Sequence, residues 1–328
     1  MKEKMKTVTS PGQFFLFGEH GVVYNQPALI ASTDLLVRVD LRKTKNSKFI
    51  IKSENLGKAK GAIEKNNYGK WKITEKKGNS ENLKYVFSAV EKTFNYISKA
   101  NGLKISIKSD IPPSSGLGSS SAVTTATIAG TSSILEKELD QDEIINLSYK
   151  TEKEIQGFTS KAGVSAAAIG GCLSIEENEI KPIDQFPPTK IVIGDTGTHS
   201  QTKKIIEKVK NEKESQPNIY NPIIEAIGQN TRTGIEAFKK TDIEKVGLLM
   251  NVNQNLLEGL GVSTRKLETL IRKARDSGAL GAKITGSGGG GCMIAIGDGN
   301  EKEIQNSINN KAHSSFITEI GGARLNIE

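Results

Sequence analysis

The sequence predicts an α+β protein that is divided into two domains. Segments with strand spacing and segments with helix spacing are mixed in both halves of the chain, as in α+β proteins. The length of 328 residues exceeds that of one usual domain, roughly 100–200 residues. At 177–190, "ENEIKPIDQFPPTK" joins paired prolines to mixed charge, which is typical of a domain boundary. We therefore expect an N-terminal domain over residues 1–180 and a C-terminal domain over residues 181–328.

The first part of the chain has the pattern of strands. The segment at 14–24, "FFLFGEHGVVY", is strand-like at both ends around a Gly-Glu-His-Gly turn. The segment at 28–42 is rich in β-forming residues, and its second half alternates apolar and polar residues. Short strands are expected at 48–53 and 70–75, separated by loops of Lys, Gly and Asn. At 103–110, "LKISIKSD" alternates with period two and predicts a further strand.

Helical spacing appears first at 81–102, where apolar residues recur on one face before an Asn-Gly stop. A long helix of small residues is expected at roughly 119–136, a second near 141–156, and a strand near 172–176. The C-terminal half opens with a predicted strand, "KIVIGDTG", and closes with a strand pair that contains the turn "TGSGGGGC". Between them, amphipathic helices are expected at 201–214, 221–238, 241–258 and 263–276.

The formal net charge of +8 favours anionic partners. The excess is concentrated at 42–77, which carries twelve Lys or Arg against three Glu. Aromatic residues are sparse there, and no RNA-binding signature of the "RGFGFV" kind is present. We therefore interpret the segment as a solvated basic surface and expect no nucleic-acid partner.

The chain has the composition of a cytoplasmic protein. No run of about 18 apolar residues exists to span a membrane. The charged N-terminus, "MKEKMKTVTSPG", lacks the apolar segment of a secretory signal. Cys172 and Cys292 lie far apart in the sequence and are expected to be buried and reduced. With three histidines in the whole chain, a zinc site is not expected.

The segment at 112–122, "PPSSGLGSSSA", lies between a predicted strand and a predicted helix. Gly116 and Gly118 allow a positive φ and a close approach to a ligand, and the following helix offers free N–H groups. These features suit a phosphate group, although neither the Walker pattern nor the dinucleotide pattern is present. Taken alone, the segment is equally compatible with an ordinary helix start after a flexible loop.

Two further segments are candidates for the walls of a site. Ordering the four consecutive glycines Gly288–Gly291 costs much backbone entropy. Their position inside a strand pair indicates that the backbone there lies in close contact with a neighbouring group. The turn that contains Glu19 and His20 could place a carboxylate and an imidazole at a pocket wall. A Glu-His pair in a turn is by itself usually a surface feature.

These segments occur in the order found in the GHMP small-molecule kinases. The residues that carry the resemblance are "SPGQFFLFGEHGVVY", "DIPPSSGLGSSSAV", "IVIGDTGTHSQTK", "LLMNVNQNLLEGLGVST" and "GAKITGSGGGGCM", which span almost the whole chain. "GEHGVVY" and "NVNQNLLEGLGV" resemble the mevalonate kinase branch, and the short chain is similar to archaeal members.

The resemblance implies an N-terminal domain like domain 2 of ribosomal protein S5 and a ferredoxin-like C-terminal domain. It implies ATP- and Mg²⁺-dependent phosphorylation of the mevalonate primary hydroxyl in isoprenoid biosynthesis. ATP and mevalonate are the implied partners, without nucleic acid or membrane, and a homodimer is left open.

The resemblance also assigns site residues. Ser120 and Glu152 match the family's Mg²⁺-associated positions. The residues implied for mevalonate are Glu19, His20, Gly286, Ser287 and Gly288. The residues implied for the ATP phosphates are Pro113, Ser114, Ser115, Gly116, Leu117, Gly118, Ser119, Ser120 and Ser121.

The sequence departs from the family at two catalytic positions. Gln13 stands where mevalonate kinases usually have a lysine, and Gly163 stands where they have the catalytic aspartate. The whole of 155–175 contains no Asp or Glu. Losing both members of such a pair avoids leaving one buried charge unpaired, which indicates a rebuilt site.

A missing general base slows phosphoryl transfer by about 10²–10⁴-fold without abolishing it, because positioning and charge stabilisation dominate the catalysis. Lys161 is the remaining charge near this position, and we expect Lys161 and Gln13 to be catalytic substitutes. The alternative for Lys161 is an ordinary solvent-facing lysine. Two alternative functions stay open: a GHMP kinase for another hydroxy acid or isoprenoid precursor, and a non-catalytic pseudokinase that binds ATP.

Overall fold

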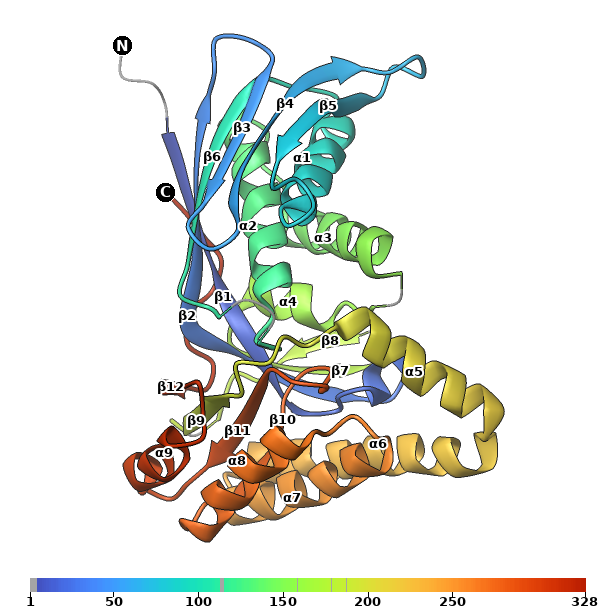
Figure 1. Cartoon of the computed structure of the whole chain (residues 1–328), viewed down its shortest axis with the longest axis vertical. Helices are drawn as coiled ribbons and strands as arrows, with labels where there is room; N and C mark the ends of the chain where they lie inside the picture. The colour runs from blue at the N-terminus through green and yellow to red at the C-terminus, as the bar shows by residue number, and fades with distance from the viewer. Residues whose placement is uncertain (1–4, 113–114, 158, 178, 187) are drawn as a thin grey trace.

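Two β-sheets, one built largely from each half of the chain, organise the fold (Figure 1). The structure is a computed structural model that describes residues 5–112, 115–157, 159–177, 179–186 and 188–328. In these residues the first sheet has the strand order β13-β1-β2-β6-β3-β4-β5, with β7 paired to β2 and β8 to β7. Its strands are β1 (Met5–Phe17), β2 (Ala28–Lys43), β3 (Lys48–Ser53), β4 (Gly57–Lys65), β5 (Trp71–Gly78), β6 (Leu103–Ser109), β7 (Cys172–Glu176), β8 (Glu179–Pro182) and β13 (Asn326–Ile327).

Helices cover one face of the first sheet. They are α1 (Lys84–Tyr96), α2 (Ser119–Ile134), α3 (Gln141–Gln156) and α4 (Ala162–Ile169). The short 3-10 helix η1 (Gly21–Tyr24) follows β1. Helix α2 lies against β1 and β2, where its small residues permit close packing: a side chain at Gly130 would overlap Leu41. The predicted patterns are confirmed, because α1 buries its apolar face and β6 buries Leu103, Ile105 and Ile107.

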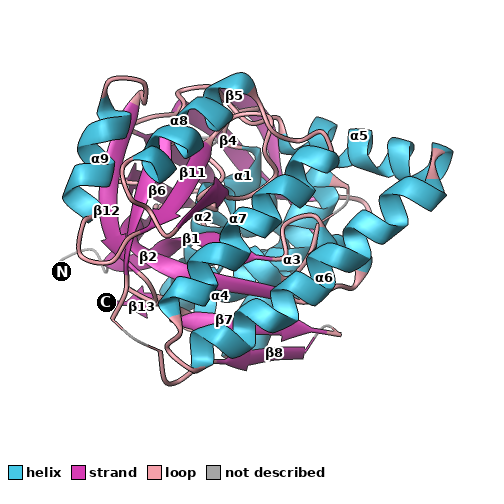
Figure 2. Ribbon diagram, turned by 90° about the horizontal axis from the view of Figure 1, so that it is seen from below, coloured by secondary structure: helices cyan, strands magenta, loops and turns pink. Residues whose placement is uncertain are grey.

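The second sheet has the order β10-β11-β9-β12 and is antiparallel throughout. Its strands are β9 (Lys190–Asp195), β10 (Gly281–Ile284), β11 (Cys292–Ile296) and β12 (Ser314–Glu319). The helices of this half are α5 (Thr202–Ser215), α6 (Pro217–Lys239), α7 (Ile243–Gly259), α8 (Arg265–Asp276) and α9 (Glu301–Asn309). Figure 2 shows α6, α7 and α8 packed together, whereas the end of α5 projects from the body.

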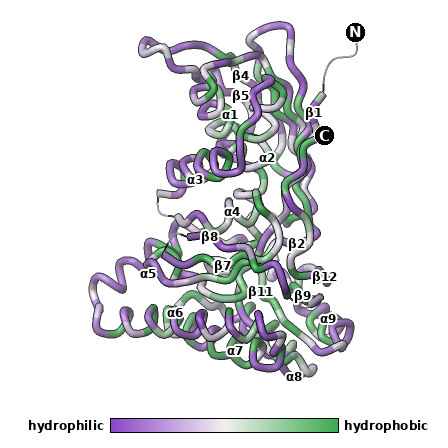
Figure 3. The backbone as a smooth tube through the Cα atoms, turned by 180° about the vertical axis from the view of Figure 1, so that it is seen from behind, coloured by the Kyte–Doolittle hydropathy of each residue, from purple (hydrophilic) through white to green (hydrophobic). Residues whose placement is uncertain are grey.

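The segments that project from the body of the molecule are the more hydrophilic ones. Figure 3 shows the projecting end of α5 and the β4–β5 hairpin as largely hydrophilic. The basic segment predicted as a solvated surface forms β3, β4 and β5, where most lysines are exposed. Cys172 and Cys292 are buried and unpaired, as expected. In the described part of the chain, no helix is both long and apolar enough to cross a membrane.

The last residues return to the first sheet. β13 pairs antiparallel with β1, with Val8 opposite Ile327. The segment after 181 therefore contributes to both sheets, and the division at residue 180 remains a prediction.

Candidate functional site

A cavity of about 630 Å³ lies where the two halves of the chain meet. Its walls come from β1, the start of α1, the loop before α2, the C-terminal end of α3, the start of α5 and the glycine-rich turn between β10 and β11. Most of the residues that the sequence assigned to ATP and substrate line this cavity. Pro113 and Ser114 lie outside the described residues.

The first glycine turn has the backbone that the sequence predicts. Gly116 and Gly118 have φ values of 82° and 67°, which side chains rarely adopt. Gly118 is also the N-cap of α2, and no described side chain caps this helix. The Gln13 N–H donates to the Leu117 carbonyl at 3.0 Å and holds the loop against β1. The first N–H groups of α2 are therefore available for an anion.

The second glycine cluster presses against the first. Gly288–Gly291 all have positive φ, and a Cβ at Gly291 would stand 2.5 Å from the Ser115 carbonyl oxygen. The next residue, Cys292, donates its N–H to that same oxygen at 2.7 Å. The prediction of a backbone pressed against another group is confirmed, and that group is the phosphate-loop candidate itself.

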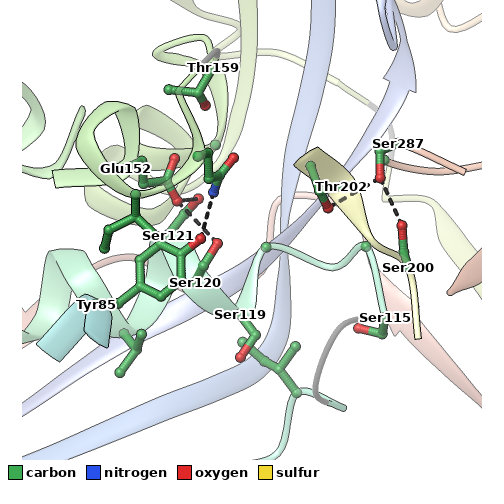
Figure 4. A pocket seen from close by; sticks show the side chains of 18 of the residues that line it. Tyr85, Ser115, Ser119, Ser120, Ser121, Glu152, Thr159, Ser200, Thr202 and Ser287 are labelled. Carbon is green, nitrogen blue, oxygen red and sulfur yellow. Dashed lines mark hydrogen bonds between the residues drawn. The ribbon is translucent and has the colours of Figure 1, made fainter. Parts of the chain in front are cut away.

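A buried carboxylate lies at the start of α2. Glu152, on α3, is 3% exposed and accepts hydrogen bonds from Ser120 at 3.1 Å and Ser121 at 2.8 Å (Figure 4). Burial raises the pKa of Glu152, because water no longer solvates the charged form. The structure thus brings together Ser120 and Glu152, the two residues that the resemblance assigned to Mg²⁺.

Tyr85 extends this network and was not identified from the sequence. Its hydroxyl accepts a hydrogen bond from Gln156 at 3.0 Å, and burial raises the pKa of Tyr85 to about 12. The hydroxyl is therefore neutral at physiological pH. No spacing distinguished Tyr85 from the other residues of α1, because its importance comes from the approach of α3.

The donor atoms around Glu152 fit a hard cation. One carboxylate and one serine hydroxyl supply the oxygen ligands that Mg²⁺ prefers. Among the described residues, Glu152 has no ion-pair partner, and no group of three or more His, Cys, Asp or Glu forms a complete metal site. Such a partial set is typical of Mg²⁺ that is held jointly by protein and nucleotide phosphates.

Glu19 forms a buried ion pair across the two halves. Lys283, on β10, contacts Oε1 of Glu19, and both side chains are fully buried. Asn253, on α7, donates to Oε2 at 2.9 Å. Both carboxylate oxygens are thus engaged by the protein, and a contact of Glu19 with substrate stays a prediction. Asn253 lies in the motif "NVNQNLLEGLGV" that carries part of the resemblance, but no local pattern predicts its contact with Glu19.

His20 holds the glycine-rich turn. Its Nε2 donates to the Ser287 carbonyl at 3.0 Å, since a carbonyl oxygen can only accept. Burial lowers the pKa of His20, which favours the neutral imidazole. The residue has a φ of 58°, a conformation that costs about 1–3 kcal/mol for a residue other than glycine. Gly286, Ser287 and Gly288, the other residues expected at the substrate end, form this turn.

Hydroxyl groups from α5 and its preceding loop face the turn (Figure 4). Ser200 Oγ is 2.8 Å from Ser287 Oγ, which in turn donates to Thr202 at 3.2 Å. Lys203 and Lys204 follow and line the same cavity. This segment, "THSQTK", is part of the family resemblance, but no local pattern in it predicts a role in the site.

Gln13 and Gly163 lie side by side at the cavity wall. Gln13 is 3% exposed, and a side chain at Gly118 would overlap its amide. A Cβ at Gly163 would stand 2.7 Å from Ser121 Oγ and 3.1 Å from Gln13 Nε2. The space beside Gly163 is therefore occupied by a neutral amide and a hydroxyl.

Lys161 does not line the cavity. Its Nζ donates to Asn146 at 3.0 Å and lies 5.9 Å from the centre of the Tyr149 ring, so its charge faces the outside of α3. Lys161 precedes α4 and its side chain extends toward α3, away from the cavity in which a catalytic substitute would act. A catalytic role for Lys161 has no support from this geometry.

Known proteins resemble the chain over its full length. Two family models match, "GHMP kinases N terminal domain" over residues 84–171 and "GHMP kinases C terminal" over residues 235–314. The mevalonate kinase of Pyrococcus furiosus is 37% identical over 331 residues, covering 99% of each chain. The mevalonate kinase of Methanocaldococcus jannaschii is 32% identical and covers 92% of this chain and 95% of its own.

Solved structures share the fold. The crystal structure of the Methanococcus jannaschii mevalonate kinase has a TM-score of 0.80 at 29% identity, covering 98% of this chain and 99% of that one. The L. major mevalonate kinase in complex with R-mevalonate has a TM-score of 0.78 at 23% identity, covering 96% of each chain. The two-domain α+β fold predicted from the sequence is thus confirmed.

Proposed function

The chain belongs to the mevalonate kinase family of the GHMP kinases, and we propose that it transfers the γ-phosphoryl group of ATP to the primary hydroxyl of (R)-mevalonate, giving 5-phosphomevalonate. The observation that carries the proposal is the buried Glu152 carboxylate beside the turn Gly116–Gly118. A carboxylate that is buried without a basic partner is costly unless a cation accompanies it in function. A nucleotide–metal complex at the start of α2 would supply that cation.

The nucleotide would extend along the cavity from α1 to the start of α2. Near α1 the lining is mostly apolar and includes Leu56, Leu83, Val86 and Ile107, which suits an adenine ring. The phosphates would then meet the glycine turn and the N–H groups of α2, where the helix dipole favours negative charge. Lys84, at the start of α1, lines the same region.

Mg²⁺ would be held by Glu152 and Ser120 together with phosphate oxygens, and it supplies neutralisation of the charge on the transferred group. Ser121 donates to the same Glu152 oxygen and keeps the carboxylate oriented. The hydrogen bond between Gln156 and Tyr85 lies beside this carboxylate and limits the movement of α3 relative to α1.

The acceptor would occupy the opposite end, between β1 and the start of α5. The hydroxyls of Ser200 and Thr202 line this region, as do Lys203 and Lys204. Two lysines next to hydroxyl groups favour an acceptor that carries both a carboxylate and alcohol groups. Mevalonate has this chemistry. His20 and the Glu19–Lys283 pair would fix the wall against which it lies.

A coupled assay for ADP release tests this proposal. The enzyme is supplied with ATP, Mg²⁺ and, separately, (R)-mevalonate, phosphomevalonate and homoserine, and products are identified by phosphorus NMR. We expect turnover with mevalonate and a new phosphate monoester at its primary carbon. Turnover with another acceptor alone would assign a different GHMP kinase activity. Tight ATP binding with no turnover in any mixture would indicate a pseudokinase.

A further inference from the structure

Gln13 presents a buried acceptor atom that has no partner among the residues that the structure describes. Its Oε1 is inaccessible to solvent and receives no hydrogen bond from the described residues. The residue nevertheless lines the cavity, at the junction between the glycine turn before α2 and the start of α4. Buried polar atoms are rarely left unpaired in native proteins, and such an atom at a cavity wall indicates a donor supplied by a ligand.

The surroundings of Gln13 narrow the nature of that donor. The Gln13 backbone is fixed by the bond from its N–H to Leu117, so the side chain starts from the loop proposed to bind phosphate. On its other side lie Gly163 and the Ser121 hydroxyl, which itself donates to Glu152. A ligand atom that meets Oε1 here would stand near the proposed metal and γ-phosphate. The chemically reasonable donor at that point is the hydroxyl that attacks phosphorus.

We propose that Gln13 orients the acceptor alcohol: when substrate binds, the amide turns toward the cavity and its Oε1 accepts the hydrogen bond of the reacting hydroxyl. This inference rests on the proposed function only in requiring an alcohol as the acceptor. A glutamine amide carries an acceptor and a donor but no charge, so it avoids the desolvation cost of a buried carboxylate or ammonium. The neutral Gln13 side chain thus occupies the space of the lysine and aspartate that the family has at positions 13 and 163, and it takes over part of their role.

The transfer step balances without a protein base. The hydroxyl oxygen forms a bond to the γ-phosphorus as the bond from that phosphorus to the β–γ bridging oxygen breaks, and ADP leaves with the electron pair. The hydroxyl proton passes to a non-bridging oxygen of the transferred group. From there it is released to water, because the second pKa of a phosphate monoester is about 6. The Gln13 amide is chemically unchanged.

The variant Gln13→Met tests the inference, because it keeps the length of the side chain and removes the amide. We expect kcat to fall roughly 10- to 100-fold, since the hydroxyl loses its orientation, with little change in the KM for ATP. The melting temperature of the unliganded protein should stay equal or rise, because an unpaired buried acceptor has been removed. A residue with only a structural role would show the opposite: a lower melting temperature and an unaltered kcat for the folded fraction.

The matched control is Gln229→Met, the same exchange on the exposed surface of α6. It should leave kcat unchanged. A kcat for Gln13→Met within about threefold of wild type would overturn the inference. If the wild type phosphorylates an alcohol other than mevalonate, the proposed function fails, whereas the Gln13 test is run unchanged with that alcohol.

A pair of variants tests whether positions 13 and 163 share one space. Gly163→Asp alone should lose activity, because its Cβ would crowd Ser121 Oγ at 2.7 Å and the Gln13 amide at 3.1 Å. The double variant Gln13→Lys/Gly163→Asp should recover at least about tenfold over Gly163→Asp, since the amide is gone and the two charges can pair. A double variant no more active than Gly163→Asp would overturn the shared-space argument.

Discussion

The ion pair between Glu19 and Lys283 offers a quantitative test of how the two halves of the molecule are joined. Both side chains are fully buried, and Lys283 also donates to the Ile284 carbonyl at 2.5 Å. Replacing Lys283 by methionine leaves the Glu19 charge buried without a cation, although the hydrogen bond from Asn253 remains. Breaking a buried pair in this way costs about 3–5 kcal/mol. We expect that loss in the free energy of unfolding.

The double variant Glu19→Gln/Lys283→Met separates charge from packing. It removes both charges and keeps an amide that can bond to Asn253, so its stability should lie within about 1–2 kcal/mol of wild type. Urea unfolding followed by fluorescence and by circular dichroism measures both differences. Lys77→Met, on the exposed surface of β5, is the control and should change stability by less than about 0.5 kcal/mol. A double variant as unstable as the single one would refute the electrostatic argument.

Three further predictions follow from the site. Lys161→Met should retain kcat within about threefold, because the lysine bonds to Asn146 outside the cavity; a larger loss in the coupled assay would restore its catalytic role. Gly291→Ala should weaken ATP binding at least about tenfold in calorimetry, because its φ is 71° and its Cβ would stand 2.5 Å from the Ser115 carbonyl oxygen; unchanged affinity would contradict the packing of the two turns. Burial lowers the pKa of His20 below its usual 6.5, so the unfolded state binds a proton more readily and stability should fall as the pH drops below 6.5. In His20→Gln that part of the pH dependence should disappear from melting curves, and a persistent slope equal to wild type would assign it to other groups.

The spacing of apolar residues along the sequence predicted those helices and strands that bury one face in a hydrophobic core. The spacing in α1, the alternation in β6 and the positive φ at Gly116 and Gly118 all follow from residues close in sequence. β4 was missed because its lysines and glycines hide the alternation of a half-exposed strand. Helix α9 was also missed, although Ile304 and Ile308 have helical spacing and are buried.

The parts of the site that depend on distant segments could not be predicted in the same way. The partner of Glu19 is separated from it by 264 positions, and no local pattern indicates the pairing. The direction of the Lys161 side chain depends on how α4 begins beside α3. The occupation of the Gly163 space by the Gln13 amide likewise appears only when β1 meets α4.

The contact between the two glycine turns couples the binding of the nucleotide to the contact between the two halves of the chain. The Ser115 carbonyl accepts from Cys292, and the Phe15 N–H donates to Thr285 at 2.9 Å, so the phosphate loop is part of the seam between the halves. If ATP and the acceptor both bind more tightly when these turns are in contact, each raises the affinity of the other by the same factor, because coupling free energies are reciprocal. We therefore expect positive cooperativity between the two substrates, and a substitution that separates the two turns, such as Gly291→Ala, should reduce both this cooperativity and the affinity for ATP.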